Sequence, residues 1–136
     1  LGGAINCSKG SMEIIHTEFL NNNASQEGGA IFNFGKINII KSTFENNDSN
    51  LGGAIINKTF YQSDLDGFNY LKETIDVDNS GIIKINETSF IKNSVKEDGG
   101  AILNWCNINI INSRFESNKS SRNIKHLSQE INQRCA

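Results

Sequence analysis

The sequence has no long run of charge and no apolar run of membrane length, and these absences exclude several classes of function. Its 13 basic and 15 acidic residues give a net charge of −2, and neither sign is concentrated in one stretch. Nucleic-acid and membrane surfaces both need a basic patch, so we expect no nucleic-acid partner. Contact with a membrane is expected only through parts outside this chain.

The chain also lacks an initiator Met and an apolar signal stretch. It begins at Leu1, inside a phrase that recurs later in the sequence. We therefore expect it to be a piece of a longer protein, whose remaining repeats would be its immediate neighbours.

Two short phrases recur along most of the chain. Phe-to-Phe spacings are 25, 46 and 25 residues, so one unit has about 25 residues and the third unit is nearly doubled. A fixed period of this size predicts a solenoid, in which no unit buries its apolar face alone. Gly-Gly-Ala-Ile begins at Gly2, Gly28, Gly52 and Gly99, and Phe-x-x-Asn begins at Phe19, Phe44, Phe90 and Phe115.

Alignment of the units on the Phe shows strict alternation before it. Aliphatic residues stand seven and five positions before the Phe, with polar residues between them, which predicts a strand with one buried face. A small hydroxyl stands two positions before the Phe, so the inward parity slips at position minus four or minus three, and we expect a corner there. The aliphatic positions are Met12, Ile37, Ile83 and Ile108, then Ile14, Ile39, Ile85 and Ile110.

Asn follows each Phe by three residues, and a second Asn follows the Gly-Gly-Ala-Ile phrase. Because Asn tolerates the left-handed conformation, we expect the first Asn to open a polar turn that leads to the bend at Gly-Gly. Parallel stacking would place like residues above like and form Asn ladders. The second Asn is Asn33, Asn57 or Asn104, with Asn6 taken as equivalent after a one-residue shift. The residues predicted to be structural are Gly28, Gly29, Phe19, Phe44, Phe90, Phe115, Asn22, Asn47, Asn93 and Asn118.

The three cysteines form no recognisable framework. Cys7 and Cys106 lie on well separated units, and strands about 4.8 Å apart would keep their Cα atoms beyond the ~7 Å that a disulfide spans. A bridge between Cys106 and Cys135 stays open, but buried or free thiols are the preferred interpretation.

The leucine-rich repeat is a rival solenoid with a similar period, but it needs a helical segment after the Asn. Here that interval is short, polar and ends in Gly-Gly, so no helix fits. The third unit carries extra residues at 58–80, which we interpret as a projecting loop, with a degenerate rung as the alternative. This loop is a candidate ligand-binding element because binding residues are often carried on loops. Its aromatic residues are Phe60, Tyr61, Phe68 and Tyr70.

The repeat pattern lapses after Asn118. Apolar residues at Ile124, Leu127, Ile131 and Cys135 have the spacing of an amphipathic helix. We therefore divide the chain into repeats at 1–118 and a segment at 119–136, which is either a cap or the start of further sequence.

Alternation of the two tetrapeptides over residues 2–118 resembles the repeat of the chlamydial polymorphic outer membrane proteins. It is also similar to adhesin-like proteins of methanogenic archaea that share this repeat. The resemblance implies an all-β, right-handed parallel β-helix, a single-stranded solenoid like that of pectate lyases, with about 4–5 rungs. It also implies a location at the cell surface, associated with the outer membrane or cell wall, and a role in adhesion. No catalytic residues come with these motifs.

Parallel β-helices also host polysaccharide lyases and glycoside hydrolases, so an enzyme is the alternative from another class. Sugar hydrolysis needs two carboxylates about 5 to 9.5 Å apart. No carboxylates stack in the outward columns three and six positions before the Phe, where Lys41 beside Glu87 predicts a cross-strand ion pair instead. His16 and His126 are interpreted as solvent-facing, and Trp105 as the cover of a turn.

Residues 76–87 match the oxygen-ligand pattern of an EF-hand calcium loop. However, Ile83 and Ile85 already belong to the repeat columns, which makes this segment a strand that could not wrap Glu87 back onto an ion. A partial calcium site at Asp76, Asp78 and Ser80 is kept as a hypothesis, and no other cofactor is expected.

Taken together, these patterns predict a non-catalytic, surface-exposed β-helix segment that serves display and adhesion. Its expected partner is a cell-surface glycan or protein ligand. The runner-up is a polysaccharide-processing enzyme on the same scaffold.

Overall fold

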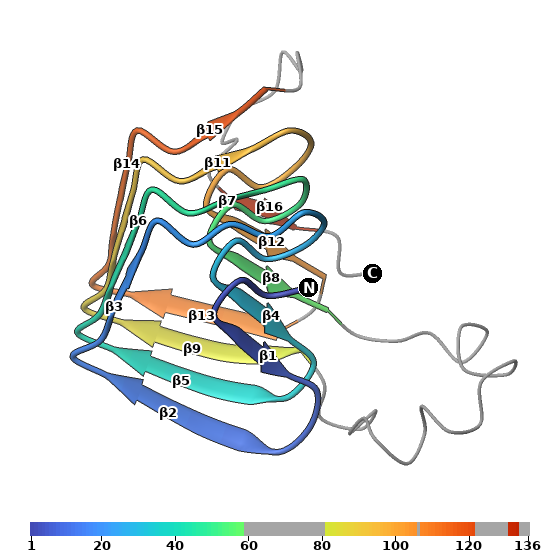
Figure 1. The fold of residues 1–136 in the computed structure, drawn as a ribbon. Coiled ribbons are helices and arrows are strands. Elements are labelled where there is room, and N and C mark those ends of the chain that lie inside the picture. Colours follow the sequence, from blue (N-terminus) through green and yellow to red (C-terminus); the bar gives the residue numbers. More distant parts are fainter. Residues whose placement is uncertain (59–80, 106, 122–130, 134–136) are drawn as a thin grey trace, which may run out of the picture.

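A computed structural model describes residues 1–58, 81–105, 107–121 and 131–133 of the chain. In these ranges all regular secondary structure is β-strand, and each strand pairs in parallel with the equivalent strand of the next unit. The chain winds around a central core as a parallel β-helix, and its strands stack into four parallel sheets around that core (Figure 1). The predicted fold class is confirmed.

Successive turns of the helix contribute equivalent strands to the four sheets, although the first turn has only an isolated bridge at Asn23 in place of a sheet D strand. Sheet A contains β1 (Ile5–Cys7), β4 (Ile31–Asn33), β8 (Ile55–Asn57), β12 (Ile102–Asn104) and β16 (Ile131–Gln133). Sheet B contains β2 (Ser11–Ile15), β5 (Lys36–Ile40), β9 (Ile82–Asn86) and β13 (Asn107–Ile111). Sheet C contains β3 (Glu18–Leu20), β6 (Thr43–Glu45), β10 (Ser89–Ile91) and β14 (Arg114–Glu116). Sheet D contains β7 (Asp48–Ser49), β11 (Ser94–Val95) and β15 (Lys119–Ser120).

Sheet D was not anticipated, since the interval after the Asn was expected to be a polar turn. Ser94 pairs with Asp48 and Lys119, and the inward residue Val95 is almost fully buried. These short segments are extended because each lies beside the same segment of the adjacent rung, which satisfies its backbone groups.

The Phe column forms a continuous stack through the core. The Phe19, Phe44, Phe90 and Phe115 rings lie nearly parallel, with centroids 4.6, 4.9 and 4.8 Å apart along the stack. This spacing equals that of adjacent strands, so in-register pairing alone sets it. The inward aliphatic residues of sheets A and B complete the same core.

Two Asn ladders run along the stack, as predicted. In the first, each Asn donates through its Nδ2 to the Oδ1 of the Asn in the next rung, at 2.9, 2.9 and 2.8 Å for Asn22, Asn47 and Asn93. The side chains of Asn47, Asn93 and Asn118 also donate to the carbonyl of the Phe one rung below. The second ladder joins Asn33 to Asn57 at 2.9 Å and Asn57 to Asn104 at 2.6 Å. Buried amides are therefore paired rather than orphaned.

The corner before the Phe is confirmed, because the residue three positions before it has a left-handed backbone in every unit. A second left-handed column stands two positions after the Phe, one residue before the Asn that was expected to adopt this conformation. That expectation was wrong because the Asn side chain is committed to the ladder and needs an extended backbone that points it inward. The columns are His16, Lys41, Glu87 and Asn112 (φ 50, 49, 48 and 48°), then Asn21, Asn46, Lys92 and Ser117 (φ 57, 54, 54 and 56°).

The two glycines of each Gly-Gly pair are needed for different reasons. Gly52 has φ +66°, a conformation that favours glycine. Gly53 lies against the next rung, where an added Cβ would be 2.0 Å from the carbonyl oxygen of Gly100. One glycine makes the bend, and the other lets adjacent rungs approach.

Cys7, rather than Asn6, occupies the ladder position in the first unit, which corrects the assignment from the sequence. Cys7 pairs with Asn33, whereas Asn6 pairs with the outward Phe32. The Cys7 Sγ donates to the Lys9 carbonyl at 3.8 Å, as the Asn33 Nδ2 donates to the Gly35 carbonyl. Cys7 is a free, buried thiol, and burial raises its pKa. Cys106 and Cys135 lie outside the described residues.

The chain continues the stack beyond Asn118. Lys119–Ser120 extends sheet D, and Ile131–Gln133 extends sheet A, with Ile131 paired to Ile102. The predicted helix is therefore wrong at Ile131–Gln133. The open edge of β12 offers backbone partners to this segment, and that pairing outweighs a helical spacing of apolar residues.

The described residues on the two sides of 59–80 form an ordinary rung. Lys58 takes the place of Phe34, and Gly81 takes the place of Gly35, so that β5 pairs directly with β9. The choice between a loop and an extra rung falls on residues 59–80, which lie outside the described residues.

Candidate functional site

The outer face of sheet B carries two adjoining hollows, which we call the sheet B trough. The larger has a volume of about 690 Å³ and the smaller about 260 Å³. Asn38 of β5 and Lys84 of β9 line both, so the hollows meet at the centre of the sheet. The trough runs from Glu13 on β2, across all four strands, to Asn109 and Ile111 on β13.

Strand alternation determines which side chains line the trough. The inward residues Ile37, Ile39, Ile83 and Ile85 are almost fully buried, so the residues between them face outward. Three outward columns result; the first two change from rung to rung, whereas the third is Ile in all rungs but one. They are Ser11, Lys36, Ile82 and Asn107; Glu13, Asn38, Lys84 and Asn109; and Ile15, Ile40, Asn86 and Ile111.

The trough has a net positive charge. Lys36 is half-buried and Lys84 is exposed, and neither makes an ion pair or side-chain hydrogen bond within the described residues. The nearest outward carboxylate, Glu13, accepts a 3.4 Å hydrogen bond from the Nδ2 of Asn38. Among the described residues, two ammonium groups on adjacent strands therefore have no carboxylate partner.

Lys41, at the edge of this face, already has a carboxylate partner. Lys41 and Glu87 lie 4.0 Å apart at the corner between sheets B and C, which confirms the predicted ion pair. Both side chains are about half exposed, so the pair contributes only about 0.2–1 kcal/mol.

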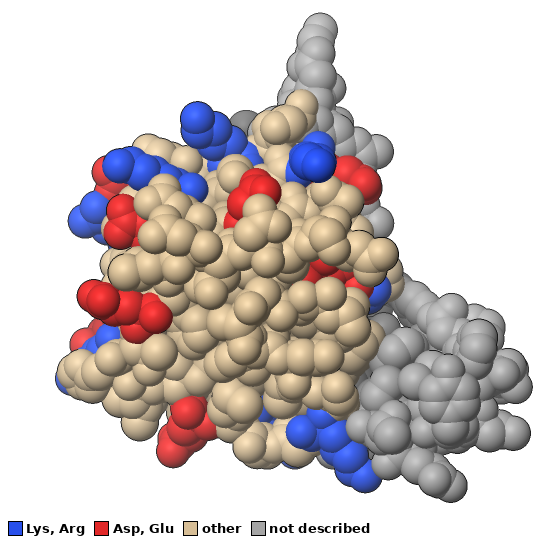
Figure 2. Space-filling view, viewed as in Figure 1, with Lys and Arg blue, Asp and Glu red and all other residues tan. Residues whose placement is uncertain are grey.

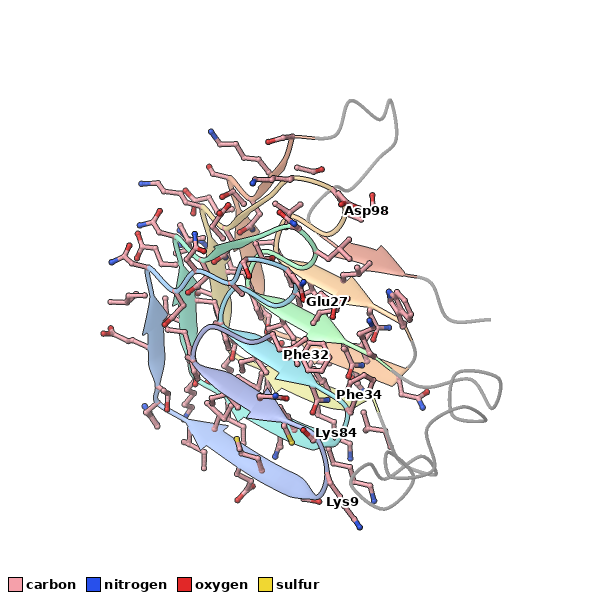
Figure 3. All side chains as sticks on the ribbon, turned by 45° about the vertical axis from the view of Figure 1, so that its right-hand side comes forward. Lys9, Glu27, Phe32, Phe34, Lys84 and Asp98 are labelled. Atoms are coloured by element: carbon pink, nitrogen blue, oxygen red, sulfur yellow. The ribbon has the colours of Figure 1, made fainter. Side chains whose placement is uncertain are left out.

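A second apolar cluster lies outside sheet A. It contains Phe32, Phe34, Ile56 and Leu103, with Trp105 packed against it. The Lys58 Nζ lies 4.5 Å from the Trp105 ring centroid and 2.8 Å from the Glu27 carboxylate. Figure 3 shows Phe32 and Phe34 together beside β4, with Glu27 nearby. Trp105 thus packs on this apolar cluster, and Lys58 is paired within the molecule.

The site shows no arrangement typical of catalysis or of a metal centre in the part that the structure describes. Glu13 is the one outward carboxylate among the described residues of sheet B, where a hydrolase needs two. Within the same ranges no group of three or more His, Cys, Asp or Glu side chains is placed to hold a metal ion. Nor do these residues form any helix long and apolar enough to cross a membrane.

The residues singled out from the sequence fall into two groups. The recurring Gly, Phe and Asn residues lie in the core, at the bends or in the ladders, and His16 is exposed. The candidate loop residues Phe60, Tyr61, Phe68 and Tyr70, the calcium candidates Asp76, Asp78 and Ser80, and His126 lie outside the described residues. Residues 82–86 form strand β9, as the competing interpretation of the calcium motif required.

Lys36, Asn38 and Lys84 were not recognised as a site from the sequence. The column of Asn38 and Lys84 was searched for paired carboxylates, not for unpaired cations, and the column of Lys36 was not searched. The available signal was that these outward positions vary while the alternating inward positions stay constant. On the face shown in Figure 2, charged side chains of both signs are scattered, and neither sign gathers into a large patch.

Two segments of the chain, residues 16–33 and 87–104, match the Chlamydia polymorphic membrane protein repeat. Each begins at a left-handed corner residue and ends at an Asn of the second ladder. The matched segments therefore cover the same part of a rung twice. No curated protein and no solved structure matches the chain.

Proposed function

We propose that this chain is a segment of a surface-exposed, non-catalytic adhesin that binds its ligand through the sheet B trough. The observation that carries the proposal is the match of two rungs to the repeat of a membrane-protein family. Each rung also supports the proposal. Its recurring residues form the core and the ladders, whereas its outward residues can contact a ligand.

The trough fits the role of a contact surface. It crosses four strands and presents amides, ammonium groups and the isoleucine Ile111, which is 51% exposed. Its rigid support keeps these side chains in fixed relative positions, which lowers the ordering cost of binding.

The experiment is adherence of beads coated with the chain to a panel of animal and microbial cells. We expect beads coated with the unaltered chain to adhere to at least one cell type, and beads coated with a Lys36→Gln, Asn38→Ser, Lys84→Gln variant to adhere much less. A variant that joins Lys58 directly to Gly81 tests the alternative that residues 59–80 carry the ligand site. Adherence that survives the trough substitutions and disappears with this deletion would refute the trough as the site. Adherence to no cell type would refute the adhesin role.

A further inference from the structure

We infer that the sheet B trough binds an acidic polysaccharide, whose carboxylate or sulfate groups pair with Lys36 and Lys84. This inference rests on the proposed function and adds the chemical class of the ligand. It begins from two cations on adjacent strands that make no ion pair with any residue the structure describes.

The register determines the spacing of the two cations. Lys84 pairs with Asn38, which stands two residues after Lys36 on β5. One strand spacing combined with two residues of rise separates the two Cβ atoms by about 8 Å. Anionic groups that recur along a polymer can pair with both ammonium groups at once without either lysine side chain bending toward the other.

Neutral polar groups in the trough suit sugar hydroxyls. Ser11 lies at one end and Asn109 at the other, with Asn38 between them. Each amide offers donors and an acceptor, as a hydroxyl does, so hydroxyl and amide can satisfy one another in either direction. Asn109 makes no side-chain hydrogen bond within the described residues, which leaves both of its functions available.

The backbone of sheet B argues against an acidic peptide. Extended peptides are commonly recognised by adding a strand to an open sheet edge, where main-chain groups give the affinity. The central strands of the trough, β5 and β9, are each paired on both sides. Their backbone groups are therefore already hydrogen-bonded, and only their side chains can contact a ligand. A ligand with hydroxyl and anionic groups along its length uses such a face better than a peptide does.

The shape of the trough favours a polymer. It crosses three strand spacings, about 14 Å, along the direction in which the rungs stack. Individual contacts between exposed charges are weak and screened by salt. Binding therefore depends on several contacts made together, and affinity should rise with the length of the ligand.

The test is isothermal calorimetry of the chain with four polymers of similar length: polygalacturonate, dextran sulfate, neutral dextran and polyglutamate. We expect binding to polygalacturonate or dextran sulfate, with affinity at least tenfold above that for dextran or polyglutamate and decreasing with added salt. The first two arms distinguish carboxylate from sulfate as the preferred group.

The variant Lys36→Gln, Lys84→Gln should lose at least tenfold in affinity for the preferred polymer. Its matched control is Lys92→Gln, Lys119→Gln, which removes the same charge from exposed positions away from the trough. The urea midpoint of each variant checks that it is folded. Equal loss in both variants, equal binding to polyglutamate, or no binding to either acidic polysaccharide would overturn the inference.

The bead assay separates this inference from the adhesin role. If cells bind the chain and the Lys36→Gln, Lys84→Gln variant equally, the acidic-polysaccharide inference fails while the adhesin role stands. If the acidic polymer binds but no cell type does, the adhesin role fails while the ligand class stands.

Discussion

The inside and the outside of sheet B follow opposite rules. Five positions before the Phe, the inward residue is Ile in all four units, whereas the outward residue just before it is Glu13, Asn38, Lys84 or Asn109. An inward side chain contacts its equivalent in the next rung, so one residue type must fit against itself. An outward side chain has solvent on one side and is free to vary. Repetition therefore marks the scaffold, and variation marks the surface that can select a ligand.

The largest effect should come from removal of a ring in the Phe stack. Phe44 is fully buried between Phe19 and Phe90. We expect Phe44→Ala to lower the free energy of unfolding by about 3–5 kcal/mol, measured by urea denaturation. The outward neighbour Glu45→Ala should change it by less than about 0.5 kcal/mol. Similar losses in the two variants would break the distinction between inside and outside.

A slightly smaller effect is expected from the first Asn ladder. Asn93 is fully buried and bonds to Asn47, Asn118 and the Phe44 carbonyl. Asn93→Ala leaves several buried polar groups unpaired and should cost about 3 kcal/mol in the same measurement. Asn38→Ala, an amide on the outer face, is the control, and a loss as large as that of Asn93→Ala would contradict the ladder's role.

Substitution of the second glycine in a Gly-Gly pair should have a smaller cost. Gly53→Ala forces its Cβ toward the Gly100 carbonyl oxygen, a backbone atom that moves only if the rungs separate. We expect a loss of about 1–3 kcal/mol in unfolding free energy. Gly10→Asn is the control, since nothing lies within 4 Å of its Cβ position and Asn accepts its positive φ. An unchanged free energy of unfolding for Gly53→Ala would contradict the close approach of Gly53 to the Gly100 carbonyl oxygen.

The smallest effect is a gain at a corner. His16 has φ 50° and is exposed. Asn adopts this conformation with less strain than His, so His16→Asn should raise the unfolding free energy by up to about 1 kcal/mol. A clear decrease would mean that the imidazole makes a contact the corner needs.

Much of the scaffold was predictable because its residues recur. Constant Ile and Phe columns indicated strands, and the slip in parity located the corner to three or four residues before the Phe, of which the structure selects three. The structure differs from the sequence prediction where the pairing with an adjacent rung decides a residue's place. Cys7 substitutes for a ladder Asn, and Ile131 extends an open strand edge despite a helical spacing of apolar residues.

The trough was not predictable in the same way. Lys36 and Lys84 lie far apart in the sequence and share no motif, and their proximity depends on the pairing of β5 with β9 across residues 59–80. The outward positions of Lys36 and Lys84 hold a different residue in most rungs, so no recurring motif marked them as a site.

The pairing of β5 with β9 is therefore the central claim, and one distance tests it directly. Nitroxide labels attached at Asn38→Cys and Lys84→Cys, in a chain whose three native cysteines are replaced by Ala, should lie one strand spacing apart. That spacing is about 4.8 Å between backbones. We predict strong dipolar broadening in the continuous-wave electron paramagnetic resonance spectrum of the doubly labelled chain, relative to the sum of the two singly labelled spectra. Identical spectra would show that the strands are not neighbours and would contradict the stack on which the trough depends.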